Sequence, residues 1–393
     1  MNFLNILKEA KIILTSPPHK EIIIFDNTSI SDLKQNLLKD YNYFLFEDRH
    51  YSITKIYISF KIFFYLIQNL NHGLKRAYKI SIIKAVNPKL ILTFIHNSEN
   101  FSFLSKILSK KYKFLAIQNA SFYYQIREES YLKKKTKYFI PHLLQLSSLD
   151  KSFYKKSNWQ VKKFNSVGSL RFDNFLKDII KKKISIKKNK FDICLLSEVD
   201  AWGIKNEKVN NGFVKLIKYT IRYANERKIK LGVALKRKRF KNYNIPLRAQ
   251  NNVTGYADEQ NWYKKNFSKE EYNYLKKRFI QNTPTSSYMC SLESKVTVAC
   301  MSTILREVFP MNKKILSCNF TSNKIYNFPI NGICSINRTC SYNYFKKRLD
   351  KIIKFKHEDY FKKYKQKKNF IMTFDYKVST SEKIKKHINN YIK

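Results

Sequence analysis

The sequence predicts an α/β protein made of two tandem domains, each a doubly wound parallel sheet, with a helical tail at the C-terminus. Two observations predict this class. Short β-branched runs alternate with longer helical stretches, which is typical of βαβ units around a parallel sheet. The 393 residues are also enough for two or three domains. We expect a first domain over 1–185, a second over 186–355 and the tail over 356–393.

The strands of the first domain are predicted from fully apolar runs, because strands buried on both faces lack polar alternation. The run EIIIFD at 21–26 precedes SISDLKQNLLKDY, where Leu33, Leu37 and Leu38 recur at helical spacing. Further strands are expected at 42–47, 88–95, 113–120, 138–146 and 161–169. Helices are expected over about 98–110 and 173–183, with a long amphipathic stretch over about 58–86.

The second domain is predicted to begin after a lysine-rich linker, KKKISIKKNK at 181–190. It repeats the alternation of the first domain, which again favours a parallel sheet. Strands are expected at 191–198, 230–238, 295–300 and 313–318. Helices are expected at about 208–229, 268–280, 302–309, 340–366 and 380–393, with a polar insertion at 240–267.

The positive charge needs an explanation, because 77 Lys and Arg stand against 29 Asp and Glu, a formal net charge of +48. Only 13 of the 77 are Arg, and the chain is also rich in Asn, Ile, Phe and Tyr, the pattern of drift towards A/T-rich codons. Nucleic-acid grooves favour Arg. We interpret most of the charge as solvated basic faces; a surface that meets anionic lipid or a polyanionic substrate is the alternative. An apolar content of 44% excludes a disordered polyelectrolyte.

The cysteines and the apolar runs bear on the compartment. Lys8, Glu9 and Lys11 interrupt the stretch that a signal peptide would keep apolar. The most apolar run, 56–70, is broken by Lys61 and is shorter than the ~20 residues of a membrane span, although it is compatible with lying on a bilayer. The cysteines form no CxxC pair and have no His at metal-ligand spacing, which predicts free thiols; they stand at 194, 290, 300, 318, 334 and 340. We expect a cytoplasmic protein, with peripheral attachment to the inner membrane as an option.

Several common catalytic motifs are absent from the sequence. The seven glycines exclude GxGxxG and GxxxxGK[ST], which removes the best markers of dinucleotide oxidoreductases and P-loop NTPases. There is no HExxH and no GxSxG. There is also no DxD to hold a nucleotide diphosphate through a divalent ion. Any nucleotide-sugar chemistry is therefore expected to need no metal and no cofactor.

Three segments carry candidate binding residues. In KVTVACMSTILREVF a strand runs into Ser302 and Thr303 at a helix N-cap, with Glu307 on the same helix face, an arrangement that offers hydroxyls and N–H groups to a phosphate. Ordinary capping is the alternative interpretation. Basic residues at the end of a predicted strand could neutralise a diphosphate, or form a plain basic loop: Lys236, Arg237 and Arg239. In SVGSLR, Gly168 permits a tight turn beside Ser169 and Arg171.

Four segments, in this order, resemble a family of bacterial surface-carbohydrate biosynthesis proteins, the O-antigen or capsule glycosyltransferases of GT-B architecture. They are NPKLILTFIHNSENF at 87–101, FLAIQNAS at 114–121, SVGSLRFDNF at 166–175 and VACMSTILREVFPMNKKIL at 298–316. The resemblance covers about 20–320. Glycerophosphotransferases of teichoic-acid synthesis, which use CDP-glycerol, are similar in architecture.

The resemblance implies two Rossmann-like domains, with a nucleotide-activated donor held by the second, an acceptor held by the first, and reaction in the cleft between them. It places Ser302, Thr303 and Glu307 at the donor. The chain departs from the family pattern at Ala120, where Gly often follows Gln-Asn, and at VFPMNKK, where a small-residue helix with Gly is common.

Transfer to a hydroxyl also needs a base to remove the acceptor proton. Glu99, His96 and Asp26 follow predicted strands of the first domain, so we expect them at the sheet edge that faces the cleft and rank them as base in that order. A helix cap or a polar loop residue is the ordinary alternative for each. Gln118 and Asn119 are expected to orient acceptor hydroxyls, together with Ser169 and Arg171; for Gln118 and Asn119 the alternative is that they satisfy backbone groups of their loop.

The leading hypothesis is a glycosyltransferase that moves a sugar from a nucleotide sugar to a lipid-linked or oligosaccharide precursor of a surface polysaccharide, with basic helices near anionic lipid. A nucleic-acid-binding protein is a second hypothesis, motivated by Tyr and Phe interleaved with Lys, although the excess of Lys over Arg argues against it. A catalytically inactive relative that binds a glycan or partner is a third, motivated by the two departures.

Overall fold

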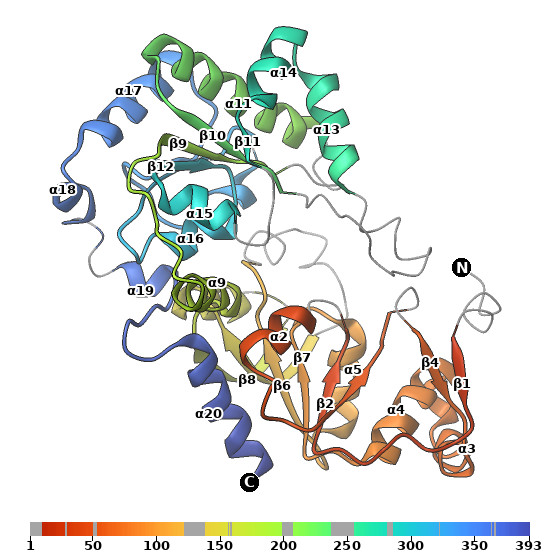
Figure 1. Cartoon of the computed structure of the whole chain (residues 1–393). Coiled ribbons are helices and arrows are strands. Elements are labelled where there is room, and N and C mark those ends of the chain that lie inside the picture. The colour runs from red at the N-terminus through yellow and green to blue at the C-terminus, as the bar shows by residue number, and fades with distance from the viewer. Residues whose placement is uncertain are drawn as a thin grey trace.

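The computed structural model describes residues 10–27, 30–49, 53–121, 138–155, 157, 159–198, 207–236, 255–280, 286–321, 323–362, 364 and 367–393. The predicted α/β class is confirmed, because each half of the chain forms a six-stranded sheet and the strand pairs of both sheets are parallel. Figure 1 shows the two sheets with helices around them and the C-terminal helix beside the first sheet. The Arg237 and Arg239 of the basic loop lie outside the described residues.

The first sheet has the strand order β3-β2-β5-β6-β7-β8. Its strands form where the sequence is β-branched and apolar: all four residues of β2 and of β5 are buried. The strands are β2 Ile22–Phe25, β3 Tyr43–Phe46, β5 Leu90–Thr93, β6 Lys113–Ile117, β7 Tyr138–Gln145 and β8 Trp159–Ser166. A separate two-stranded sheet pairs β1 Lys11–Ile13 with β4 Lys55–Tyr57.

Helices cover both faces of the first sheet. One face packs Ile80, Phe101 and Tyr154 from three helices: α4 Leu74–Val86, α5 Glu99–Leu108 and α8 Ser148–Lys155. The other face packs Leu33, Leu170, Ile384 and Ile388 from α2 Ile30–Asn36, α9 Leu170–Lys181 and α20 Thr380–Ile392. The sheet is therefore a buried middle layer, as its apolar strands require.

The second sheet has the strand order β11-β10-β9-β12-β13-β14. Its strands are β9 Phe191–Leu196, β10 Leu231–Ala234, β11 Phe279–Ile280, β12 Ser294–Ala299, β13 Lys314–Cys318 and β14 Ser335–Ile336. Its helices are α11 Glu207–Arg227, α13 Gly255–Asn266, α14 Lys269–Lys276, α15 Ser286–Leu292, α16 Thr303–Val308 and α17 Tyr342–Lys354, with the 3-10 turn η2 Lys324–Tyr326. Their apolar faces form one continuous core with the sheet.

The structure differs from the sequence expectations at several places. The helix expected over 340–366 is divided into α17 and α18 His357–Lys362. The amphipathic stretch 58–86 is divided into α3 Phe60–Ile67, the 3-10 turn η1 Leu70–His72 and α4. Gly73 separates η1 from α4 with a φ of 81°, which favours glycine. The polar insertion contains a helix, α13. The helix expected over 268–280 ends early, and its last residues form β11.

The tail returns to the first domain through α18 His357–Lys362, α19 Lys368–Ile371 and α20. The Thr373 amide donates to the Leu146 carbonyl oxygen at 3.0 Å, and the Tyr41 hydroxyl donates to Asn389 at 2.7 Å. The crossing chain passes so close to Gly168 that a Cβ there would lie 2.4 Å from the Thr373 oxygen, so glycine is required at this position. The tail thereby joins the two domains a second time.

Candidate functional site

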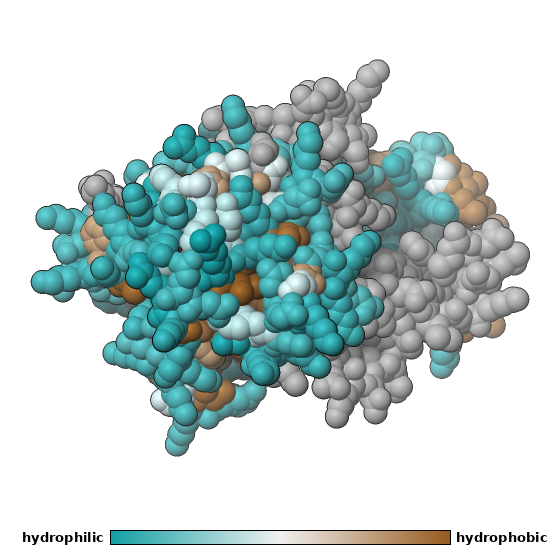
Figure 2. All heavy atoms as spheres, turned by 90° about the horizontal axis from the view of Figure 1, so that it is seen from above, coloured by the Kyte–Doolittle hydropathy of each residue, from teal (hydrophilic) through white to brown (hydrophobic). Residues whose placement is uncertain are grey.

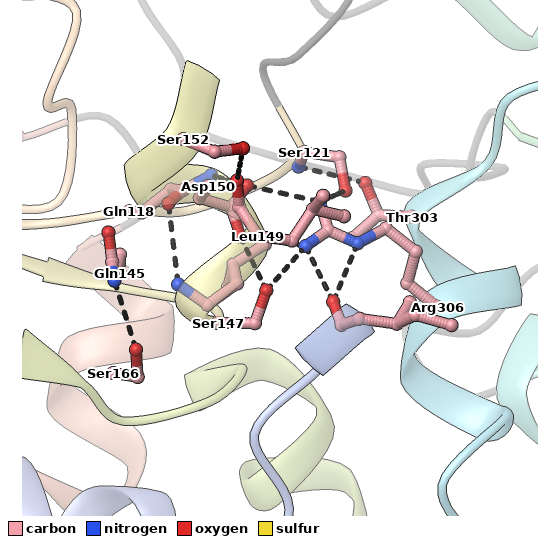
Figure 3. Close-up of polar contacts among 12 residues, drawn as sticks. Gln118, Ser121, Gln145, Ser147, Leu149, Asp150, Ser152, Ser166, Thr303 and Arg306 are labelled. Carbon is pink, nitrogen blue, oxygen red and sulfur yellow. Dashed lines mark hydrogen bonds and ion pairs between the residues drawn. The ribbon is translucent and has the colours of Figure 1, made fainter. Parts of the chain in front are cut away.

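The two domains meet through α16, which follows β12 of the second sheet. Its Arg306 reaches into the first domain and pairs with Asp150 of α8, with Nη2 2.7 Å from Oδ2 and Nη1 3.1 Å from Oδ1. Figure 3 shows this guanidinium among side chains from both halves of the chain. The Arg306 and Asp150 side chains are only 1% and 2% exposed, so this is a fully buried ion pair.

The remaining hydrogen-bonding groups of Arg306 are also satisfied. Nη1 donates to the Ser121 hydroxyl at 2.7 Å, Nη2 donates to the Ser147 hydroxyl at 3.1 Å, and Nε donates to the Ile371 carbonyl oxygen at 3.0 Å. A buried charge is stable only when its hydrogen bonds are complete. We call Arg306, Asp150, Ser121 and Ser147 the junction cluster; it fixes how the domains sit on one another.

The predicted donor hydroxyls lie beside the junction cluster. The Ser302 side chain accepts from the Ile304 amide at 3.3 Å, so it is the N-cap that the sequence predicts. The Thr303 hydroxyl accepts from the Ser121 amide at 3.1 Å, across the domain junction. Both hydroxyls therefore already hold backbone groups, and a role at the donor stays a prediction.

Glu307 is buried at the same junction, next to residues predicted for the acceptor. The Ser169 hydroxyl donates to Oε1 at 2.5 Å and the Tyr288 hydroxyl donates to Oε2 at 2.9 Å. Burial raises the pKa of Glu307, while the Ser169 and Tyr288 hydrogen bonds and the nearby Arg171 oppose that rise. The structure thus brings together Ser169 and Glu307, which lie 138 positions apart in the sequence.

Arg171 and Asn119 lie on the first-domain side of this junction. Arg171 donates from Nε to Asp32 at 2.9 Å and from Nη1 to the Asn119 carbonyl oxygen at 3.4 Å. Burial lowers the pKa of Arg171, but the paired Asp32 outweighs this and the pKa is raised. Gln118 is buried and donates to Asp150 at 3.0 Å, so it supports the junction cluster. Of the predicted acceptor residues, Gln118 and Ser169 are thus tied to the junction by hydrogen bonds.

The three predicted bases differ sharply in environment. His96 is completely buried beside the Tyr154 and Trp159 rings, and burial lowers its pKa to about 3, so the ring is neutral at neutral pH. Asp26 is buried and paired with Arg49, with Nε 2.7 Å from Oδ2. Glu99 is exposed at the first turn of α5 and accepts from the Tyr138 hydroxyl at 3.2 Å. Only Glu99 has the exposure that contact with a substrate requires.

Lys236 is exposed two residues after β10, at the carboxyl edge of the second sheet. Its amide donates to Glu259 Oε1 at 3.1 Å, and the Ser197 hydroxyl donates to the same oxygen at 2.5 Å. Glu259 is buried and orders the ends of β9 and β10. The position of Lys236 is the one where ligands of open parallel sheets bind.

Sequence reasoning missed Glu198, which follows β9. Its buried carboxylate accepts from the Cys300 amide at 2.5 Å and from the Met301 amide at 2.8 Å. It also missed Arg306 and Asp150, whose only sequence signal was an arginine inside a short, mostly apolar helix. Glu198 occupies N–H groups of the loop before α16, the same loop that the sequence suggests for a phosphate.

Two kinds of site are not found in the part of the chain that the structure describes. No three His, Cys, Asp or Glu side chains gather there in a way that could hold a metal ion. Among the described helices, none is both long and apolar enough to cross a membrane. The six cysteines, all described, are free thiols.

No family model and no curated protein sequence matches the chain. It is similar in structure to the UDP-GlcNAc 2-epimerase from Methanocaldococcus jannaschii, at 12% identity and a TM-score of 0.47, covering 94% of this chain and 99% of that one. It is also similar to the UDP-GlcNAc 2-epimerase from Neisseria meningitidis bound to UDP-GlcNAc, at 10% identity and a TM-score of 0.46, covering 94% of this chain and 99% of that one. A third similar structure is the wall teichoic acid polymerase TagF, at 11% identity and a TM-score of 0.46, covering 95% of this chain and 88% of that one. Such values carry no argument about what this chain binds.

Proposed function

We propose that this protein is a metal-independent glycosyltransferase that moves a sugar from a nucleotide-activated donor to a precursor of a surface polysaccharide. The observation that carries the proposal is the convergence of residues predicted separately, from two distant parts of the sequence, on one junction. Ser169 of the first domain donates to Glu307 of the second, and Thr303 of the second accepts from the Ser121 amide of the first. Gln118 donates to Asp150, the carboxylate that pairs with Arg306. A transferase of two tandem domains needs donor and acceptor to meet at such a junction.

The proposed reaction assigns one role to each domain. Glu99 removes the proton from an acceptor hydroxyl, the hydroxyl oxygen bonds to the sugar carbon, and the bond from that carbon to the donor phosphate oxygen breaks. The nucleotide leaves with the additional negative charge, which Lys236 stabilises from the carboxyl edge of the second sheet. His96 is not suited to hold the proton, because a pKa of about 3 makes it a very weak base.

Turnover of nucleotide sugars by the full chain tests this proposal. Release of nucleotide is measured with a panel of nucleotide sugars and CDP-glycerol, with an oligosaccharide or lipid-linked acceptor. Glu99→Gln is expected to lower kcat by roughly 100-fold or more, the usual size of a general-base contribution, without weakening nucleotide binding. Glu21→Gln is the matched control, because Glu21 is exposed before β2 and pairs with Lys89. Turnover unchanged by Glu99→Gln would remove Glu99 as the base.

A specific observation also favours a second candidate, a catalytically inactive relative that binds a glycan or a partner. Glu198 holds the Cys300 and Met301 amides, and Glu307 is held by Ser169 and Tyr288. These groups maintain the domain junction instead of being open to a donor. The same turnover assay separates the two candidates, because release of nucleotide above background by the wild-type chain would exclude a catalytically inactive protein.

A further inference from the structure

The small sheet β1–β4 and helix α3 carry a concentration of exposed apolar side chains. We call the described residues 11–14 and 55–74 the apolar lobe. Nine of the 15 large hydrophobic residues that are exposed in the described chain belong to it, with exposed fractions from 46% to 86%: Ile12, Leu14, Ile58, Phe60, Phe63, Phe64, Ile67, Leu70 and Leu74. Figure 2 shows brown surface at the right-hand end of the molecule, the side where Figure 1 places β1, β4 and α3.

The exposed side chains of α3 follow helical spacing. Phe60, Phe63, Phe64 and Ile67 stand at i, i+3, i+4 and i+7, the pattern that normally marks the face of a helix turned to the core. In α3 the stripe faces outward, and the one buried residue of the helix is Ile62, which lies outside the stripe. Soluble proteins rarely leave such a contiguous apolar face in water, so the stripe indicates contact with a second phase or partner.

Hydrogen bonds fix the position of α3 and of the neighbouring strand β4. The Ser59 side chain caps α3 by accepting from the Ile62 amide at 3.3 Å, and it is hydrogen-bonded to the Ser16 hydroxyl at 2.8 Å. The Tyr78 hydroxyl of α4 binds both the amide and the carbonyl oxygen of Tyr57, at 2.9 and 3.1 Å. The outward stripe is therefore anchored to the first domain by specific hydrogen bonds.

The segments that carry the stripe are basic. Residues 11–20 and 53–86 contain eight Lys and Arg and no Asp or Glu. The acidic neighbours are Glu47, which accepts from the Thr54 hydroxyl, and Asp48, which is paired with Lys79. Lys11, Lys55, Lys61 and Lys75 are exposed on the elements that carry the apolar side chains. Aromatic side chains ringed by lysine match an anionic lipid surface, where the rings enter the interface and the ammonium groups meet phosphate headgroups.

We propose that the apolar lobe docks this protein on an anionic lipid bilayer, with α3 lying in the plane of the interface. The eight residues of α3 are far too few to span a bilayer. A second copy of the chain is disfavoured as the occupant, because a two-fold interface would bring each basic rim against its own equivalent. The proposal needs no transferase activity, and it can hold whether or not the proposed function does.

Vesicle co-sedimentation of the full chain tests the proposal. The vesicles contain phosphatidylcholine with or without about one third phosphatidylglycerol. We expect binding to the anionic vesicles that weakens with salt, and much weaker binding to pure phosphatidylcholine. The triple variant Phe60→Ser, Phe63→Ser and Phe64→Ser is expected to bind the anionic vesicles at least ~100-fold more weakly, because it removes three aromatic rings from the interface.

The matched control replaces three equally exposed apolar residues elsewhere: Ile180→Ser, Tyr376→Ser and Val378→Ser. It is expected to bind like the wild type. Equal binding by wild type and triple variant, or an equal loss in the control, would overturn the proposal. So would a dimer without vesicles that the triple variant converts to a monomer, which assigns the stripe to a second copy. If the triple variant fails to fold, Phe63→Trp replaces it: quenching of the new indole by brominated lipid is expected, and no quenching overturns docking through α3.

Discussion

Two short helices, α16 at the domain junction and α3 in the apolar lobe, depart from the usual distribution of side chains. The first buries charged residues, and the second exposes apolar ones. In α16, Arg306 and Glu307 are the charged residues and both are buried. In α3, six of the eight side chains are Phe, Leu or Ile and one, Ile62, is buried. The first helix buries charge because the first domain supplies matching hydrogen bonds; the second exposes apolar surface that no described part of the chain covers.

The surroundings of each helix explain which of its side chains are buried and which are exposed. For α16 the groups that bind its buried charges belong to the first domain: Asp150, Ser121 and Ser169. For α3 no described part of the chain supplies such groups, and the lysines beside the stripe lead us to infer a lipid surface. Mutations at the junction should therefore change the free energy of unfolding, whereas mutations in the stripe of α3 should change binding and leave folding alone.

The largest effect is expected from Arg306→Ala. This change leaves the Asp150 carboxylate buried without its cation, and such breaks cost about 3–5 kcal/mol of unfolding free energy. Urea denaturation measures the loss. The double variant Arg306→Met with Asp150→Leu is the control, since replacing both partners by apolar residues should recover much of the stability. A loss below about 1 kcal/mol for Arg306→Ala would show that the junction cluster does not hold the domains together.

A smaller effect is expected from Ser169→Ala, which removes one of the two hydroxyls that bind Glu307. Hydrogen bonds to charged groups contribute about 1.5–3 kcal/mol, so stability should fall by about that amount. A double-mutant cycle with Glu307→Ala, which removes both carboxylate oxygens, isolates the interaction between the two residues. Additive effects in that cycle would contradict a direct Ser169–Glu307 contact.

Stability should fall as pH is lowered from 7 to 5, in part because of His96. Its pKa is 6.5 in the unfolded chain and about 3 in the folded protein, so below pH 6.5 the unfolded state binds a proton that the folded state excludes. At pH 5 this costs about 2 kcal/mol. His142, whose pKa burial lowers to about 4, acts in the same direction.

Denaturant titrations at pH 7 and pH 5 measure this difference for wild type and for His96→Leu. We expect the variant to lose about 2 kcal/mol less between the two pH values than the wild type does, whatever its stability at pH 7. An unchanged pH dependence would mean that His96 accepts a proton in the folded protein, and would restore it as a candidate base.

The smallest effect on folding is expected for the triple serine variant of Phe60, Phe63 and Phe64. These side chains are exposed in water, and surface substitutions away from buried contacts usually change stability by less than about 0.5 kcal/mol each. Thermal unfolding without lipid measures this. Destabilisation by several kcal/mol would show that the stripe packs within the chain, and would remove the contrast with α16.

Much of the fold could be predicted from the sequence, because strands buried on both faces leave unbroken apolar runs. EIIIFD predicted β2, and KVTVAC predicted β12. The two-residue edge strands β11 and β14 could not be predicted, since such short pairs carry no period. The stripe of α3 was equally ambiguous, because its spacing looks the same whether the face turns to the core or to a membrane.

The site could be predicted only in part. Residues that follow strands, such as Lys236 and Ser302, could be predicted because position in a βαβ unit determines the edge they occupy. The residues that bind them in the structure could not be predicted from the sequence. Asp150 and Arg306 are separated by 156 positions, and Glu198 reaches Met301 across 103. Contacts over such distances in sequence leave no local pattern.

The central claim, a nucleotide-activated donor bound by the second domain, is tested most directly by thermal unfolding of the full chain with nucleoside diphosphates, nucleotide sugars and CDP-glycerol. A ligand at 100 times its Kd stabilises the native state by about 2.7 kcal/mol, enough to raise the Tm measurably. We predict a shift with one nucleotide base that Lys236→Ala reduces and Lys276→Ala, an exposed lysine of α14, does not. No shift with any nucleotide, together with salt-sensitive retention on RNA or DNA, would contradict the account.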